Sequence, residues 1–312
     1  MEIGINIKYL NKNLFTKFFL LMGIFDKPAR ADVLNMINSS GYNSCLKCLH
    51  SGKGIKTSKG GHKRVFVYQF NKPLKRNRKN YAQHALSAEK NIGVVRGIKG
   101  WSILCHLKYL NPTRNTCIDY MHSILLGVMK TFFKYWWETD SSKPYSLKKF
   151  MPSINEKLIR IRPPSFVSTP PRSIHVWQKW RAHEYLHFMI HYLVPVFNNV
   201  VPKIIFDNII KLVIFMQIIL NQKINRKYLK QAQVLIERFL NELVDIYDEA
   251  IMVSGTHELI HLIDCTLDFG PLNNINCFPY EEMNRKFLSC IKGIMFNFYK
   301  MYKKFSFVKA KT

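Results

Sequence analysis

Two pairs of metal-binding residues, one near each end of the chain, constrain most strongly how this sequence can fold. Cys45 and Cys48 form a Cys-x-x-Cys pair in a lysine-rich loop, and His257 and His261 stand four apart in the segment THELIHLID. Side chains four residues apart share one face of a helix, so both imidazoles can bind one tetrahedral ion. A single zinc site that uses all four residues requires segments more than two hundred residues apart to meet.

The histidine pair also belongs to a literal His-Glu-x-x-His, the zinc-protease signature in which Glu258 activates water. Glu281 follows the second histidine by 20 residues, where a third ligand of a thermolysin-like protease can stand. A protease does not need the two cysteines, whereas a four-ligand site needs them and leaves Glu258 without a metal role. The four-ligand hypothesis explains both pairs together, and the zinc protease remains the alternative.

The cysteine pair alone has further interpretations. A redox dithiol typically opens a helix directly after a strand, but here the pair follows a predicted helix. Two unrelated buried cysteines fit poorly with a lysine-rich loop. His50 and His62 are nearby candidates for completing ligands, although each is more often a plain loop histidine. The odd number of cysteines, 7, favours a reducing compartment, nuclear or cytosolic, over a disulfide framework.

The charge balance is strongly basic. The chain carries 47 Lys and Arg against 20 Asp and Glu, a formal charge of +27, and residues 1–114 hold 21 of the basic but only 4 of the acidic side chains. Such a balance favours a polyanionic partner, most often nucleic acid, with an anionic membrane surface as the alternative. A basic tract at 72–79 is the predicted DNA-backbone contact, unless it is a solvated loop or a nuclear-import signal. Its cations are Lys72, Lys75, Arg76, Arg78 and Lys79.

Two long apolar runs do not predict a membrane protein. The run Leu14–Phe25 carries Lys17 and lacks a small-residue cleavage site, so we expect a buried strand or helix rather than a signal peptide. The run Ile204–Leu220 contains Asp207 and Lys211 and is short for a transmembrane helix. We therefore expect no membrane partner.

Hydrophobic periodicity predicts an α/β start followed by a long helical region. Residues 18–26 are predicted as a buried strand that ends at Asp26, a helix is expected from Pro28 towards Gly41, and residues 65–70 are predicted as a strand. From residue 115 to residue 250 the pattern is almost entirely helical, with a proline-rich break at 160–173, and a last helix is expected over 280–302. The first inward stripe of the helical region comprises Ile118, Met121, Leu125, Val128, Phe132 and Trp136.

Three carboxylates stand at the edges of apolar segments. Asp26, Asp119 and Glu281 occur in GIFDKPAR, TCIDYMH and CFPYEEMN. Carboxylates that converge from distant segments can hold a pair of Mg²⁺ ions for in-line phosphodiester chemistry. Surface carboxylates are far commoner than catalytic ones, so this hypothesis depends on whether the three segments meet.

Five blocks of the sequence resemble, in order, the conserved blocks of CACTA (EnSpm-like) transposases and of the transposase-domain proteins of animal genomes. These blocks are FDKPARADVLNMINSSGYNSCLKCLHSG, VVRGIKGWS, CIDYMHSILLGVMK, THELIHLIDCTLDFGPL and CFPYEEMNRKF. The resemblance runs from Gly23 to Phe287. It implies an α/β fold with a partial ribonuclease-H-like core over 1–114, interrupted by a large α-helical insertion over 115–255 and completed by a closing segment over 256–312.

The resemblance also implies roles for the site residues. Asp26 corresponds to the second catalytic aspartate and Glu281 to the catalytic glutamate, both ligands of Mg²⁺. Asp119 and His122 match the family's Asp-x-x-His block, which is expected near the active centre without an assigned role. The two metal-binding pairs correspond to a structural zinc site, similar to that of the related Transib transposases and the V(D)J recombinase. Its ligands are Cys45, Cys48, His257 and His261.

Two departures from the family qualify these roles. Residues 1–25 contain no aspartate and only Glu2 as an acid, so two-metal chemistry lacks its first, bridging aspartate. Glu258 stands where the family has an uncharged residue and is interpreted as a chance substitution.

The sequence therefore predicts a transposase-derived, nuclear DNA-binding protein, from a truncated or domesticated copy, that does not cleave DNA strands alone. The alternatives are the zinc protease and a non-catalytic nuclear protein that binds zinc and DNA. Whether the chain forms a homo-oligomer stays open.

Overall fold

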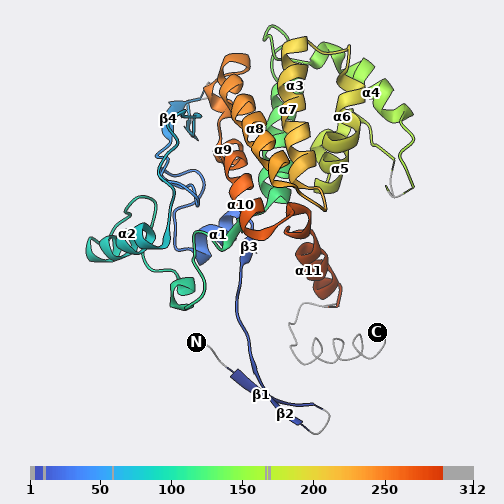
Figure 1. The fold of residues 1–312 in the computed structure, drawn as a ribbon. Helices are drawn as coiled ribbons and strands as arrows, with labels where there is room; N and C mark the ends of the chain where they lie inside the picture. Colours follow the sequence, from blue (N-terminus) through green and yellow to red (C-terminus); the bar gives the residue numbers. More distant parts are fainter. Residues whose placement is uncertain (1–3, 10–11, 58–59, 166, 168–169, 291–312) are drawn as a thin grey trace.

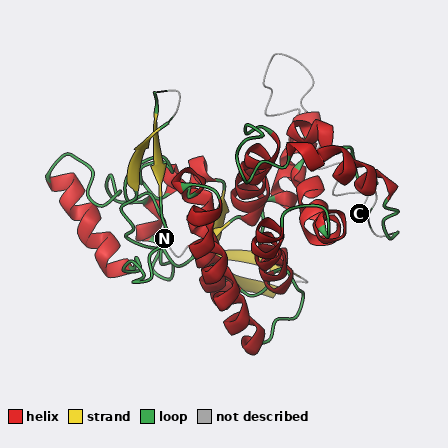
Figure 2. Ribbon diagram, turned by 90° about the horizontal axis from the view of Figure 1, so that it is seen from above, coloured by secondary structure: helices red, strands yellow, loops and turns green. Residues whose placement is uncertain are grey.

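The computed structural model describes residues 4–9, 12–57, 60–165, 167 and 170–290. These residues form a mixed α/β structure in which helices predominate and the sheets are small, as Figures 1 and 2 show. The predicted mixed α/β class is confirmed. The strands are β1 (Gly4–Tyr9), β2 (Lys12–Lys17), β3 (Gly23–Phe25), β4 (Lys53–Lys56), β5 (His62–Val65) and β6 (Thr116–Ile118).

Most helices follow β6. The α-helices are α1 (Lys27–Val33), α2 (Arg78–Lys90), α3 (Lys130–Trp137), α4 (Met151–Arg160), α5 (Ala182–His187), α6 (Leu193–Phe197), α7 (Lys203–Ile219), α8 (Arg226–Ile246), α9 (Ser254–Glu258), α10 (Leu262–Phe269) and α11 (Phe278–Cys290). The π-helical segments are η2 (Met121–Met129) and η5 (Phe188–Tyr192). The 3-10 segments are η1 (Ile103–His106), η3 (Lys148–Phe150), η4 (Ile174–Lys179), η6 (Glu249–Ile251), η7 (Leu259–His261) and η8 (Leu272–Asn274).

Each described sheet has two strands, and one of the three is parallel. β1–β2 and β4–β5 are antiparallel hairpins, whereas β3 pairs in parallel with β6, so that Phe25 lies opposite Ile118. The carboxyl ends of parallel strands lie at the same edge of a sheet. Because each of these two strands is followed at once by an aspartate, Asp26 and Asp119 are placed at that common edge.

The expectation of a buried element over Leu14–Phe25 is wrong for most of its length. β1 and β2 form a hairpin that projects from the body of the molecule, so Phe15 in β2 is exposed, as are Phe18 and Leu21 in the segment that follows it (Figure 1). β3 is half-buried, and the segment before it touches the body through Phe19, whose ring packs edge-on against Tyr109 with centroids 5.5 Å apart. The sequence pattern shows that the segment is apolar, but burial also requires a second layer of structure to pack over the strand.

Two other predicted elements are shifted by tertiary contacts. α1 begins after Asp26 as expected but ends at Val33, because Asn35 takes a left-handed φ of 46° and turns the chain. The strand expected over 65–70 ends at its first residue, since the Phe66 N–H donates to the carbonyl oxygen of Met252 and leaves the hairpin for the core.

The buried side chains form a large core and a small one. The large core contains the whole predicted stripe of the helical region, together with the inward faces of α7, α8 and α10. The small core lies in the first third of the chain, and its members are Leu34, Met36, Leu46, Tyr81, Ala85, Ile98, Leu104 and Leu110. Residues 256–277 pack into the large core, so the closing segment shares its packing with the helical region.

The late helices also bear on two expectations. The apolar run at 204–220 forms α7, which packs against α8, and no helix in the described part of the chain is long and apolar enough to cross a membrane. The expected last helix is present as α11 up to Cys290, and its remainder lies outside the described residues.

Candidate metal centre and adjoining carboxylates

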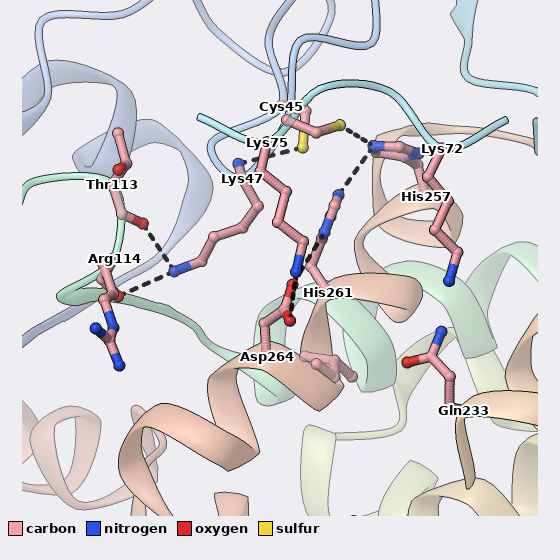
Figure 3. A network of polar contacts seen from close by, with 12 residues as sticks. Cys45, Lys47, Lys72, Lys75, Thr113, Arg114, Gln233, His257, His261 and Asp264 are labelled. Carbon is pink, nitrogen blue, oxygen red and sulfur yellow. Dashed lines mark hydrogen bonds and ion pairs between the residues drawn. The ribbon is translucent and has the colours of Figure 1, made fainter. Parts of the chain in front are cut away.

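The cysteine pair and the histidine pair meet in space. Cys45, Cys48, His257 and His261 are all buried, and one ligand atom from each lies within 4.8 Å of the others. The Cys48 Sγ is 3.2 Å from His257 Nε2. His257 Nε2 is in turn 3.3 Å from His261 Nε2, and Figure 3 shows these two rings side by side near Cys45. The predicted meeting of the two pairs is confirmed, and these four side chains, the Cys₂His₂ cluster, lie close enough together to bind one metal ion.

A close approach of two helices positions the histidine side of the cluster. His257 lies in α9 and His261 ends η7, so the two imidazoles follow one another around one helical turn. α9 packs against η2. A Cβ at Gly255 would lie only 3.1 Å from the carbonyl oxygen of Ser123, so a glycine at this position favours the close approach of α9 to η2.

The cysteine side of the cluster is a loop held by a buried lysine. The backbone N–H of Lys47 donates to Cys45 Sγ at 3.4 Å. Its Nζ donates to the carbonyl oxygens of Thr113 at 2.8 Å and Arg114 at 3.1 Å (Figure 3). These bonds fix the loop between Cys45 and Cys48 against the segment that leads into β6.

The two thiols differ in their tendency to ionise. Burial would raise the pKa of Cys45, but a hydrogen bond from Cys48 and the nearby His261 and His257 outweigh burial and lower it. The pKa of Cys48 is raised, because its thiol donates to Cys45 and because it is buried. The pair thus favours one thiolate and one thiol, and a bound cation is what would favour two thiolates.

The two nearby histidines of the first third do not complete the cluster. His50 packs edge-on against His257 with ring centroids 5.1 Å apart, but its Nε2 bonds the Val67 carbonyl oxygen at 2.9 Å and its Nδ1 accepts from the Gly52 N–H at 3.0 Å. His62 lies exposed on β5. Among the residues that the structure describes, the candidate ligands at this place are therefore the two predicted pairs.

Glu258 is the residue whose role the sequence misjudged. It is 3% exposed, and its carboxylate accepts from Arg30 Nη2 and Ser123 Oγ, with Lys27 Nζ 3.5 Å away. Burial would raise the pKa of Glu258, but Arg30 and Lys27 lower it. Glu258 is thus not incidental: it ties α9 to α1 and η2. The available signal was Arg30, one turn before the buried Leu34 and therefore on the inward face of α1.

The basic tract divides into paired, buried and exposed cations. Lys72 pairs with Glu237 at 2.5 Å, and Lys75 pairs with Asp264 at 2.8 Å. Both lysines line a pocket of about 80 Å³ beside the histidine pair, and Figure 3 shows Lys75 reaching Asp264 one turn beyond His261. These two lysines are partly neutralised by the protein itself.

Arg76 is the clearest correction within the basic tract. Its side chain is buried, and its guanidinium donates to the backbone carbonyl oxygens of Cys45 at 2.7 Å, Asn43 at 2.6 Å and Arg96 at 2.7 Å. Three backbone carbonyls need this donor, so Arg76 supports the cysteine loop and does not reach an outside partner. Arg78 and Lys79, at the start of α2, are exposed.

A second polar cluster lies at the edge of the parallel strands. Asp119, 2% exposed, accepts from the backbone N–H of Cys277 at 2.9 Å through Oδ1. Its Oδ2 accepts from both the backbone N–H, at 3.0 Å, and the ring Nδ1, at 2.7 Å, of His122. His122 Nε2 lies 3.0 Å from Glu281 Oε1 on α11. This chain of contacts is called the Asp119–His122–Glu281 centre below.

The electrostatics of this centre also involve Asp26. Burial would raise the pKa of Asp119, but hydrogen bonds from His122 and from the backbone of Cys277 lower it. The pKa of His122 is raised, first by its hydrogen bond to Asp119 and further by the charges of Glu281 and Asp26. Asp26 caps α1 by accepting from the Ala29 N–H at 2.8 Å. Two of the three predicted carboxylates, Asp119 and Glu281, therefore contact His122, and the third, Asp26, acts on it through its charge.

Comparisons with known proteins add no family to this description. No family model matches the chain, and no curated protein matches it.

Proposed function

We propose that this is a transposase-derived DNA-binding protein in which a structural zinc ion joins the first third of the chain to its closing segment. The observation that carries the proposal is the meeting of Cys45 and Cys48 with His257 and His261, in the order and spacing that the transposase resemblance implies. Two thiolates and two imidazoles are a donor set suited to zinc.

The donor count supports a structural ion over a catalytic one. A catalytic zinc keeps an open position for water, whereas four protein ligands fill a tetrahedral ion. A zinc protease also needs Glu258 as a free base, but both of its carboxylate oxygens accept hydrogen bonds, from Arg30 and Ser123. These contacts favour the four-ligand zinc site over the His-Glu-x-x-His protease.

The parallel strands support a partial ribonuclease-H-like core. β3 and β6 place Asp26 and Asp119 at one edge, and α11 brings Glu281 to the same place. In the proposed function Asp26 and Glu281 are the ligands through which Mg²⁺ would act on a phosphodiester. The family's first aspartate has no counterpart in residues 1–25, so we expect DNA binding without strand cleavage by this chain alone.

The charge of the chain supports DNA as the partner, and a nuclear location follows from it. Exposed Arg78 and Lys79 begin α2, and the first third holds 21 basic side chains against 4 acidic ones. Cations that contact phosphates give sequence-independent affinity that falls steeply with salt.

The test compares the Cys45→Ser/Cys48→Ser variant with the single variant Cys105→Ser, whose thiol is free and outside the cluster. The wild type and Cys105→Ser should each contain one zinc per chain and bind duplex DNA with a steep salt dependence. The double variant should contain none and should melt roughly 10 °C lower, because zinc binding contributes to the free energy of unfolding.

Two results would contradict the proposal. Stoichiometric zinc in the double variant, with peptidase activity that Glu258→Gln abolishes, would revive the protease. Zinc-loaded wild type without salt-dependent affinity for DNA would remove the nucleic-acid partner.

A further inference from the structure

We propose that His122 and Glu281 bind a second divalent metal ion, one that accepts nitrogen as well as oxygen ligands, such as Mn²⁺, and that Asp119 orients His122 for it. This site shares no residue with the Cys₂His₂ cluster. This proposal deepens the proposed function. It rests on that function only for the group on which the metal acts, a phosphate. Binding of the metal itself can be measured separately.

The hydrogen bonds of Asp119 assign it to orientation. Its two oxygens already accept from the backbone N–H groups of His122 and Cys277 and from His122 Nδ1. A carboxylate has about four lone-pair sites, so little of Asp119 is left for a metal ion. In metal sites a ligating histidine usually donates its second ring N–H to a carboxylate, which fixes the ring and leaves the other nitrogen for the metal. His122 and Asp119 have this arrangement.

The second ring nitrogen of His122 faces a carboxylate oxygen at a distance that suits two ligands of one metal ion. His122 Nε2 and Glu281 Oε1 are 3.0 Å apart. Two ligands bound at right angles, each about 2.1 Å from a metal ion, are separated by roughly 3.0 Å. The pair can therefore become adjacent ligands of one ion with little movement of either side chain.

The site is accessible and gathers negative charge. The Glu281 side chain is 56% exposed and that of His122 is 27% exposed, so an ion and its waters can reach them from solvent. Asp26 lies at the same edge of the parallel strands and adds a third carboxylate close enough to influence His122. An ion here would be held by protein on one side and by water or phosphate on the other.

The ligand types predict which metal is preferred. A site made of carboxylates alone suits Mg²⁺, whereas an imidazole ligand favours transition metals. We therefore expect Mn²⁺ to bind at least ~10-fold more tightly than Mg²⁺.

The experiment titrates the zinc-loaded, full-length protein with Mn²⁺ and follows free Mn²⁺ by electron paramagnetic resonance. The wild type should bind one Mn²⁺, with Mg²⁺ competing weakly. His122→Gln and Glu281→Gln should each weaken binding at least ~10-fold, and Asp119→Asn should weaken it by about 10–100-fold through loss of orientation. The matched control is Glu282→Gln, the neighbouring exposed carboxylate that pairs with Arg285, and it should bind Mn²⁺ as the wild type does.

The outcomes separate this site from the proposed function. One zinc per chain in each variant shows that the fold is intact. Asp119 also accepts a hydrogen bond from Cys277 just before α11, so Asp119→Asn can disturb the fold locally. The test of the metal site therefore depends on the His122 and Glu281 variants. Wild-type Mn²⁺ affinity in both of them overturns the proposal, as does Mg²⁺ competing equally with Mn²⁺. If the His122 and Glu281 variants lose Mn²⁺ binding and the wild type fails to bind DNA, the metal site is supported and the transposase-derived function is rejected.

Discussion

The Cys₂His₂ cluster and the Asp119–His122–Glu281 centre are both built from distant segments, yet they differ in access. All four ligands of the cluster are buried, whereas His122 and Glu281 keep an exposed edge. A closed set of four protein ligands suits an ion that holds the fold, and an open set suits an ion that must meet an outside ligand. Access, rather than residue type, is therefore what distinguishes the structural ion proposed for the first group from the exposed ion proposed for the second.

Glu258 lies between these two regions, and its removal should have the largest effect. Glu258→Ala leaves Arg30 and Lys27 facing a buried gap, so the free energy of unfolding should fall by about 3–5 kcal/mol. Urea unfolding measures this, with Glu282→Ala, which removes an exposed acid, as the control expected to leave the free energy of unfolding unchanged. Zinc content should remain one per chain. Unchanged stability with loss of a peptidase activity would instead make Glu258 a catalytic base.

The pH dependence of the same carboxylate gives a smaller, graded effect. Because the pKa of Glu258 is lowered in the folded protein, its stabilising contribution is complete above its ordinary value of 4.5 and is lost as the pH falls through the lowered pKa. The difference in unfolding free energy between wild type and Glu258→Gln should be flat from pH 7 to ~5. Below pH ~4.5 it should shrink by at most ~1.4 kcal/mol per pH unit. A difference that grows on acidification would reverse the assigned pairing.

The basic tract shows the same contrast, because Arg76 is buried whereas Arg78 and Lys79 are exposed. Substitutions of the exposed pair should have the smallest effect on stability. Arg78→Ala/Lys79→Ala should leave the melting temperature unchanged and reduce the slope of log affinity for DNA against log salt by about 2, one for each cation. Arg76→Ala should instead lower the melting temperature, since three backbone carbonyls lose their donor. If Arg76→Ala changes only the salt slope, the division between buried and exposed cations fails.

Much of the site could be predicted because its signals are local. Cys45 and Cys48, and His257 and His261, have spacings that a loop and a helical turn convert directly into shared faces. The stripe from Ile118 to Trp136 is buried as its helical period indicates. Neither signal depends on what the rest of the chain does.

Other features depended on long-range packing and could not be predicted from local patterns. The exposed run near Phe18 has the same composition as a buried strand, and Arg76 has the same charge as its exposed neighbours. Which side chains are covered depends on the segments that fold over them, and periodicity carries no information about those segments.

The sequence by itself determined the ligand types of the Cys₂His₂ cluster, the helical character after residue 115 and the excess of basic charge. Only the tertiary structure decided that Glu258 faces Arg30 rather than the metal ligands, and that His122 stands between Asp119 and Glu281. The physical reason is that residue type and spacing fix what a side chain can bind, whereas the pairing of β3 with β6 and the packing of α9 on η2 fix which groups it meets.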